Sequence, residues 1–164
     1  MFVVRQARRS DLAPLDALFA RAYPRLLRAD YPPSVLVTAI PLIARAQPAL
    51  LASGSYYVAE EAGRLLGAGG WTARGPGAGG TAPGVAHVRH MVTDDRELRR
   101  GIGRAILETA FDAARATGVT GLHCHSTRTA EAFYAAMGFA RIGPAMVPLA
   151  PGIAFPAIEM WRPL

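Results

Sequence analysis

The sequence contains little of what marks a secreted or membrane protein. Its 164 residues include a single cysteine, Cys124, which rules out an internal disulfide bond. No apolar run approaches the roughly 20 residues of a membrane-spanning helix, and residues 1–5 lack the basic segment and apolar core of a signal peptide. We therefore expect a cytoplasmic protein with no membrane partner. The length and the 51% share of hydrophobic residues predict one globular domain over residues 1–164.

Lysine is absent, so the formal net charge of +6 comes from arginine. These arginines are spread along the chain and form no continuous stripe, which argues against a nucleic-acid groove. A basic nucleic-acid-binding module stays open as an alternative, and such a module would show salt-dependent affinity for DNA or RNA. Binding of an anionic cofactor would account for part of this positive charge.

Clusters of metal ligands are also missing. His123, Cys124 and His125 are consecutive in an expected strand, where neighbouring side chains point to opposite faces. His123 and Cys124 therefore cannot chelate one ion together from a regular strand. We predict no metal, and we expect Cys124 to be a small buried strand residue.

The periodicity of apolar residues predicts a mixed α/β fold. We expect a central sheet of six or seven strands flanked by helices, with an antiparallel pair at the end. A helix capped by Ser10 should end near Tyr23 and Pro24, and Pro41 should kink or interrupt the next helix. The expected strands cover 2–7, 56–60, 64–71, 85–92, 119–126, 139–146 and 157–162, and the expected helices 10–24, 33–46, 103–117 and 129–137.

Two expected strands carry specific hypotheses. Gly67, Gly69 and Gly70 are costly in the strand 64–71 unless another group approaches closely. The strand 85–92 alternates, which predicts one face formed by Ala86, Val88, His90 and Val92 and an opposite face formed by Val85, His87, Arg89 and Met91. The segment 72–84 is rich in glycine, alanine and proline, and we expect it to be a loop.

A glycine-containing turn, Leu98 to Ala105, joins the strand 85–92 to the helix 103–117. The first N–H groups of a helix have no helical acceptor and lie at the positive end of its dipole, so such a turn is typical of phosphate binding. Gly101 and Gly103 leave room for the amides to approach a diphosphate. The turn also contains Arg99, Arg100, Ile102 and Arg104.

Two common phosphate motifs are excluded. Ile106 occupies the position where a dinucleotide fingerprint needs a third small residue, and the Gly-Lys-Ser/Thr of a Walker loop occurs nowhere. The turn instead resembles the coenzyme A diphosphate loop of the GNAT acetyltransferase superfamily, Gln/Arg-x-x-Gly-x-Gly/Ala. Leu98 stands in the Gln/Arg place, and the segment 93–98 is one residue longer than usual.

A second stretch, Thr127 to Phe139, is similar to the superfamily pattern Asn-x-x-Ala-x-x-Phe-Tyr-x-x-x-Gly-Phe. It matches at Ala130, Phe133, Tyr134, Gly138 and Phe139, and Thr127 takes the Asn place. Two motifs in the right order and separation are more specific than either alone. The resemblance implies a GNAT-like fold and acetyl-coenzyme A as cosubstrate.

The resemblance also implies roles for particular residues. Tyr134 is the candidate acid for the leaving thiolate. His90, His87 or a water relay is the candidate base, because Ala86 falls where some relatives have a glutamate. Backbone groups near Met91, where the strand should splay or bulge, would polarise the acetyl carbonyl. The implied cofactor-binding residues are Met91, Val92, Thr93, Arg99, Arg100, Gly101, Ile102, Gly103, Arg104 and Thr127.

The predicted reaction is acetyl transfer to a primary amine of a small molecule or protein. Tyr23 and Tyr31 lie in the segment that borders the acceptor in the family, so both are candidates for substrate contact. A non-catalytic acyl-coenzyme A sensor stays open as an alternative, because it would keep the loop without turnover. The oligomeric state is not fixed by the sequence, and a homodimer is compatible with it.

Overall fold

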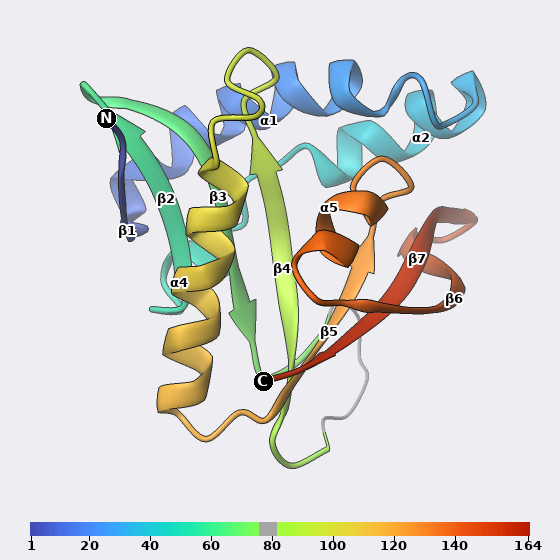
Figure 1. Cartoon of the computed structure of the whole chain (residues 1–164). Helices are drawn as coiled ribbons and strands as arrows, with labels where there is room; N and C mark the ends of the chain where they lie inside the picture. The colour runs from blue at the N-terminus through green and yellow to red at the C-terminus, as the bar shows by residue number, and fades with distance from the viewer. Residues whose placement is uncertain (76–81) are drawn as a thin grey trace.

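The structure, a computed structural model, describes residues 1–75 and 82–164 and forms a mixed α/β fold around a seven-stranded sheet (Figure 1). The strand order is β1-β2-β3-β4-β5-β7-β6, and only β4 and β5 pair in parallel. The strands are β1 (Val3–Gln6), β2 (Tyr56–Glu61), β3 (Arg64–Thr72), β4 (Val85–Thr93), β5 (Gly121–Ser126), β6 (Ala140–Ala150) and β7 (Ile153–Pro163). The helices are η1 (Arg9–Asp11), α1 (Leu12–Leu27), α2 (Pro33–Ile43), α3 (Pro48–Leu51), α4 (Ile102–Ala116) and α5 (Glu131–Ala136). The mixed α/β prediction is confirmed, and part of the expected loop 72–84 lies outside the described residues.

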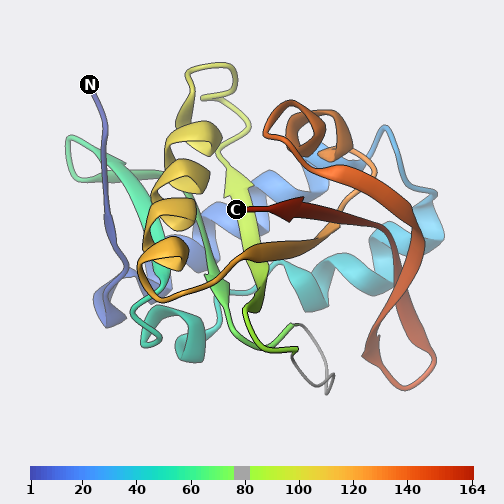
Figure 2. The ribbon, with the colours of Figure 1, turned by 60° about the horizontal axis from the view of Figure 1, so that its bottom comes forward.

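The helices cover both faces of the sheet because β2 and its neighbours are apolar on both sides. Tyr56 and Val58 pack with Leu15 and Phe19 of α1, whereas the alternate residues of β2 pack with Ile106 of α4. Helices α4 and α5 therefore lie on one face, and α1 and α2 lie on the other (Figure 2). This arrangement buries the centre of the sheet and leaves the ends of its strands accessible for a functional site.

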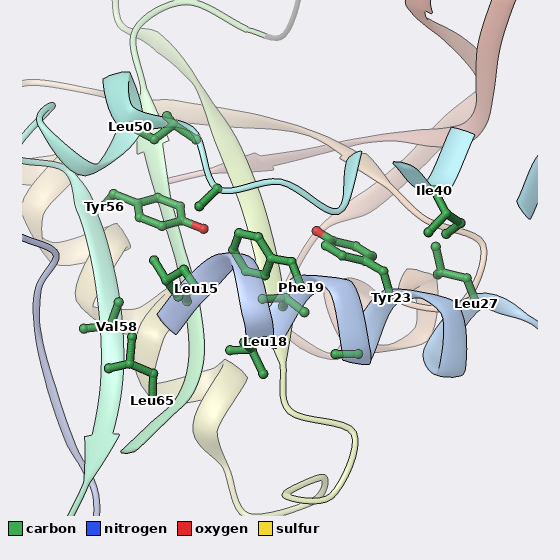
Figure 3. Close-up of a cluster of buried hydrophobic side chains, with 14 of the residues drawn as sticks. Leu15, Leu18, Phe19, Tyr23, Leu27, Ile40, Leu50, Tyr56, Val58 and Leu65 are labelled. Atoms are coloured by element: carbon green, nitrogen blue, oxygen red, sulfur yellow. The ribbon is translucent and has the colours of Figure 1, made fainter. Parts of the chain in front are cut away.

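Helix α1 presents a continuous apolar side to the sheet. Leu15, Phe19 and Tyr23 follow one another along that side, and all three are buried. Figure 3 shows the hydroxyl groups of Tyr56 and Tyr23 turned toward the space around Phe19. Two polar groups thus enter an otherwise apolar cluster, and the hydroxyl of Tyr56 has a partner described below.

The three glycines of β3 are required by close approach, as predicted. A Cβ on Gly69 would lie 1.8 Å from the sulfur of Met91, and one on Gly70 would lie 2.2 Å from the carbonyl oxygen of Ser55. At Gly67 it would meet a side-chain carbon of Ile102 at 2.9 Å. The chain can therefore pack β4 and α4 directly onto β3.

Helix α1 differs from its prediction at both ends. It continues through Pro24 to Leu27, because Tyr23 and Leu27 are buried on either side of the proline and this burial outweighs one lost hydrogen bond. Ser10 is not its cap. The turn η1 precedes the helix, and the carboxylate of Asp11 accepts the N–H of Arg8 at 2.7 Å.

The C-terminal strands are longer than predicted. The proline-containing segment expected to connect them belongs to β6 and β7, which turn at Gly152 with a φ of +75°. Pro144 and Pro148 are tolerated in β6 because this strand is the last in the sheet and pairs with β7 alone. Helix α3 was not predicted.

Candidate active site

The parallel strands β4 and β5 separate after a short paired segment. Their pairing joins Val85–His87 to Gly121–His123, although β4 continues to Thr93 and β5 to Ser126. The two strands diverge toward the side where α4 and α5 begin (Figure 1). The sheet therefore opens between its central strands, at the end that carries both sequence motifs.

A cavity of about 210 Å³ lies along this opening. It brings together four of the predicted site residues: His90, Met91, Thr127 and Tyr134. Parts of α1, of the end of α2 and of the β6–β7 hairpin complete the wall. Segments that are distant in sequence thus form one site around the splayed strands.

Strand β4 bulges at His90 and Met91. These two residues stand opposite the single residue Gly69, between the pairs Ala68↔Val92 and Gly70↔Arg89. His90 has a φ of +49°, an uncommon conformation for a residue with a side chain. The phenolic hydroxyl of Tyr56 donates to the carbonyl oxygen of His90 at 2.7 Å. The expected irregularity near Met91 is present and is held by a buried hydrogen bond.

The bulge makes the predicted alternation of β4 wrong beyond Val88. Ala86 and Val88 pack in the cluster with α4 and α5, whereas Val92 packs with α1. His90 also turns to the α1 side, where its ring lies 4.5 Å from that of Phe19. One extra residue in the strand moves every later side chain to the opposite face.

His90 is enclosed and tied to α2. Its Nε2 lies 2.8 Å from the carbonyl oxygen of Ile43, so this nitrogen carries the proton and donates it. The Nδ1 atom is buried and has no hydrogen-bond partner among the described residues. Burial lowers the pKa of His90 to about 4, so the ring is neutral at pH 7. The side chain is therefore a weak base with one free lone pair.

The turn before α4 presents unpartnered amides, as predicted. None of the N–H groups from Leu98 to Arg104 donates to an acceptor in the part of the chain that the structure describes, whereas Ala105 donates to the carbonyl of Gly101 at 3.0 Å. Arg99 and Gly101 have φ angles of +63° and +77°, which turn successive amides toward a common side. The turn and the helix dipole together fit an anionic diphosphate.

Gly103 lies where α4 packs on α5. A Cβ at this position would lie 3.2 Å from a ring carbon of Phe133 and 3.5 Å from the hydroxyl oxygen of Thr93. A Cβ on Gly101 would meet nothing within 4 Å. The second glycine is therefore needed for close packing of the two motifs, and the first for its backbone conformation.

The arginines of the turn differ in what they bind. Arg100 forms ion pairs with Glu61 at 2.9 Å and with Glu97 at 2.6 Å, which tie the turn to the β2–β3 hairpin. Arg104 pairs with Glu108 along α4 at 3.1 Å. Arg99 has no ion pair with any described residue. Of the predicted phosphate arginines, Arg99 is thus the one whose charge is not already neutralised within the chain.

A buried aspartate, which the sequence analysis did not single out, anchors the start of the turn. Asp94 is 1% exposed and accepts hydrogen bonds from Arg21 at 2.6 Å and from the N–H of Arg96 at 3.0 Å. Burial alone would raise the pKa of Asp94, but these bonds lower it to about 2. The carboxylate therefore stays charged and links α1 to the exit of β4.

Tyr134 is buried beside Cys124 at the base of the cavity. Burial and the neighbouring cysteine raise the pKa of the phenol well above its usual value, so the hydroxyl keeps its proton at neutral pH. Thr127 accepts the N–H of Ala130 at 3.1 Å and thereby shapes the entry to α5. Burial also raises the pKa of Cys124 to about 12, and this residue is the buried strand residue expected.

Two candidates from the sequence lie elsewhere. The hydroxyl of Tyr31 donates to the carbonyl of Pro156 at 2.7 Å and accepts the N–H of Arg128 at 2.9 Å, so it joins β7 to the β5–α5 loop. His87 does not line the cavity, and its ring stacks on that of His123 with centroids 5.5 Å apart. Neither is placed for the role suggested, whereas Tyr23 does line the cavity.

Comparisons with known proteins agree with this geometry. A family model described as an acetyltransferase (GNAT) domain matches residues 52–141, more than half of the chain. The chain therefore belongs to the GNAT acetyltransferase family. A search of curated protein sequences finds no significant match.

Several solved structures share the fold. The GCN5-related N-acetyltransferase from Rhodopseudomonas palustris has a TM-score of 0.76 at 20% identity, with 99% of this chain and 95% of that chain covered. The PaiA N-acetyltransferase from Thermoplasma acidophilum, solved in complex with coenzyme A, has a TM-score of 0.74 at 13% identity, with 100% and 99% covered. The ribosomal-protein-S18-alanine N-acetyltransferase from Escherichia coli has a TM-score of 0.66 at 18% identity, with 99% and 94% covered.

No group of three or more histidine, cysteine, aspartate or glutamate side chains in residues 1–75 and 82–164 is arranged to hold a metal ion. No helix in these ranges is long and apolar enough to cross a membrane.

Proposed function

We propose that residues 1–164 act as a single cytoplasmic N-acetyltransferase domain that moves an acetyl group from acetyl-coenzyme A to a primary amine. The observation that carries this proposal is the row of unpartnered amides from Leu98 to Arg104, located at the end of the splay between β4 and β5. A diphosphate bound there would lie near Thr93 and Phe133, which Gly103 faces and which are close in sequence to the cavity residues Met91 and Tyr134. Family membership and the coenzyme A complex of a structural relative support the same assignment.

The cosubstrate fits the residues present. The amides of Gly101, Ile102, Gly103 and Arg104 would bind its diphosphate, with Arg99 supplying charge from outside. Backbone groups of Met91, Val92 and Thr93, where β4 still pairs with β3 but no longer with β5, would pair with its pantetheine arm as a neighbouring strand does. Thr127 lines the cavity on the opposite side.

When bound, acetyl-coenzyme A supplies an activated acetyl group: the amine nitrogen bonds to the carbonyl carbon and loses a proton, while the carbon–sulfur bond breaks and the thiolate gains one. The bulge at His90 and Met91 would direct a backbone N–H toward the carbonyl oxygen. The hydroxyl of Tyr134 would give its proton to the thiolate. A thiolate in this apolar cavity is poorly solvated, which raises its own proton affinity and offsets part of the raised pKa of Tyr134.

His90 would receive the proton from the nitrogen. The available lone pair is on the buried Nδ1, because Nε2 donates its proton to the carbonyl oxygen of Ile43. A base with a pKa near 4 suits a nitrogen that has become more acidic by bonding to the carbonyl carbon. Water can then remove the proton from the ring.

Two measurements test the proposal. Coenzyme A at about 100 times its dissociation constant should stabilise the fold by roughly 2.7 kcal/mol and raise the melting temperature. A panel of primary amines with acetyl-coenzyme A should release free thiol at a rate that depends on the amine. Absence of any thermal shift at millimolar coenzyme A would reject the cofactor assignment, and binding without turnover on any amine would indicate a sensor.

A further inference from the structure

A single arginine on the cavity wall has no acidic partner. Arg89 is half-buried on β4, and its guanidinium donates to the hydroxyl of Thr72 at 3.0 Å and to the carbonyl of Arg74 at 3.4 Å. No carboxylate of the described residues lies within 4.0 Å of it. Residues 76–81, between β3 and β4 in the sequence, contain neither aspartate nor glutamate.

Among the described residues that line the cavity there is no aspartate or glutamate, although arginine and histidine both line it. The nearest acidic candidate on β7, Glu159, lies 3.5 Å from His123 and does not line the cavity. His125 lines it, and burial lowers the pKa of that ring, so it is neutral at pH 7. Arg89 is therefore the one fixed charge among the described lining residues, and it is positive.

The walls around this charge are apolar. Leu42 and Ile43 come from the end of α2, and Val147, Leu149 and Phe155 come from the β6–β7 hairpin. A polyamine or other multiply charged cation would find no carboxylate here and would be repelled by the guanidinium. A carboxylate would instead gain a charge-assisted and partly desolvated hydrogen bond.

Arg89 also stands at a suitable distance from the reacting position. It precedes Met91 by two residues on β4, and the left-handed backbone of His90 between them brings their Cα atoms closer than the roughly 6–7 Å of a regular strand. A small molecule whose amine faces the bulge can place a second group within reach of the long arginine side chain.

We infer that the acceptor is a small amine that also bears a carboxylate, with an apolar body, and that Arg89 binds this carboxylate. The inference rests on the proposed function and narrows its substrate. Arg89 acts here as a specificity-determining residue for the acceptor and has no part in binding coenzyme A.

The test compares pairs of acceptors in which a neutral amide replaces the carboxylate; the amide also lowers the pKa of the amine, which by itself favours the amide and so works against the expected result. Leucine against leucinamide and phenylalanine against phenylalaninamide are assayed with acetyl-coenzyme A, and spermidine serves as the cationic acceptor. We expect kcat/KM to be at least about tenfold higher for the carboxylate in at least one pair, and lowest for spermidine. Equal rates within every pair, or preference for the amides or spermidine, would overturn the inference.

Binding of the products supplies a second readout that does not depend on turnover. With coenzyme A present, calorimetry should show N-acetyl-leucine or N-acetyl-phenylalanine binding at least about tenfold more tightly than its amide. Equal affinities in both pairs would also overturn the inference.

Variants assign the effect to Arg89. Arg89→Gln should raise KM for the carboxylate acceptor about tenfold or more, leave kcat and coenzyme A affinity nearly unchanged, and abolish the difference within the pair. Arg89→Lys should restore part of the preference for the carboxylate over the amide, which would show that the loss in Arg89→Gln is not a folding defect. Arg115→Gln, at the far end of α4, should behave as the wild type. If Arg89→Gln weakens both members of a pair equally, the assignment is wrong.

The outcome separates this inference from the proposed function. Coenzyme A binding together with acetylation of amides or spermidine would retain the acetyltransferase and reject the acidic acceptor. Failure to bind coenzyme A would reject the acetyltransferase itself.

Discussion

The turn proposed to bind the diphosphate and the side of the cavity proposed to bind the acceptor differ in the groups that form them. The turn uses consecutive amides from Leu98 to Arg104, and its shape depends on Gly101 and on the start of α4. The acceptor side uses side chains from α2, from β4 and from the β6–β7 hairpin, which lie far apart in sequence. A site made of backbone is encoded locally, whereas a site made of side chains depends on how the whole fold places them.

The comparison predicts that the chemistry fails when one side chain changes, while cofactor binding survives. Tyr134→Phe removes a hydroxyl alone and should lower kcat by about 10²-fold or more if that group protonates the thiolate. Coenzyme A affinity, measured by calorimetry, should stay within about threefold. An unchanged kcat, with chemistry shown to be rate-limiting, would leave Tyr134 with a packing role.

The enclosed side of the cavity should also respond to acid. The folded pKa of His90 is about 4 and its unfolded value about 6.5, so between these values the unfolded chain binds a proton that the folded chain does not. Its contribution to stability is present above pH 6.5 and falls by about 3 kcal/mol on the way to pH 4.

Denaturant titrations of the wild type and His90→Asn from pH 7 to pH 4 check this. Asparagine tolerates the left-handed backbone of this position, so the variant should fold. Its stability should fall less steeply than that of the wild type, because the variant lacks the His90 ring that binds a proton on unfolding. His87 and His125 titrate in both proteins, so their effect is the same in the two curves. Parallel curves would mean that His90 is not held neutral by burial.

The bulge should depend on a hydroxyl outside the predicted site. Tyr56→Phe leaves the carbonyl of His90 without its buried donor and should cost about 1–2 kcal/mol of unfolding free energy. A relaxed bulge should also lower kcat by about tenfold with coenzyme A affinity retained. Tyr57→Phe, on the opposite face of β2, is the matched control, and an equal loss of kcat in both variants would contradict the role of the bulge.

The smallest expected effect concerns Arg100. Because Glu61 and Glu97 already neutralise it, Arg100→Ala should change the dissociation constant of coenzyme A by about threefold or less. Calorimetric titration measures the change. A loss larger than that of Arg99→Ala would show that the ion pairs open when the cosubstrate binds.

The features that could be predicted from the sequence are those encoded locally, and the features that could not be predicted depend on packing between distant elements. The strands, the turn and the second motif were predicted because their signals are local: apolar periodicity, Gly101 and Gly103, and the run from Ala130 to Phe139. The face of His90 was predicted wrongly, since a bulge opposite Gly69 leaves no periodic signal. Its contact with Ile43 and the exposure of Arg89 to the cavity depend on packing between distant elements.

The central claim is that backbone amides bind the diphosphate, and one calorimetric comparison tests it most directly. Gly103→Val adds a branched side chain at the second residue of α4, beside these amides and against Phe133 and Thr93, whereas Arg99→Ala removes one charge and leaves every amide in place. With melting temperatures confirming that both variants fold, Gly103→Val should nearly abolish coenzyme A binding. Arg99→Ala should cost about 1–2 kcal/mol of binding free energy at low salt and less at high salt. A larger loss in Arg99→Ala than in Gly103→Val would contradict the account, because side-chain charge would then dominate the site.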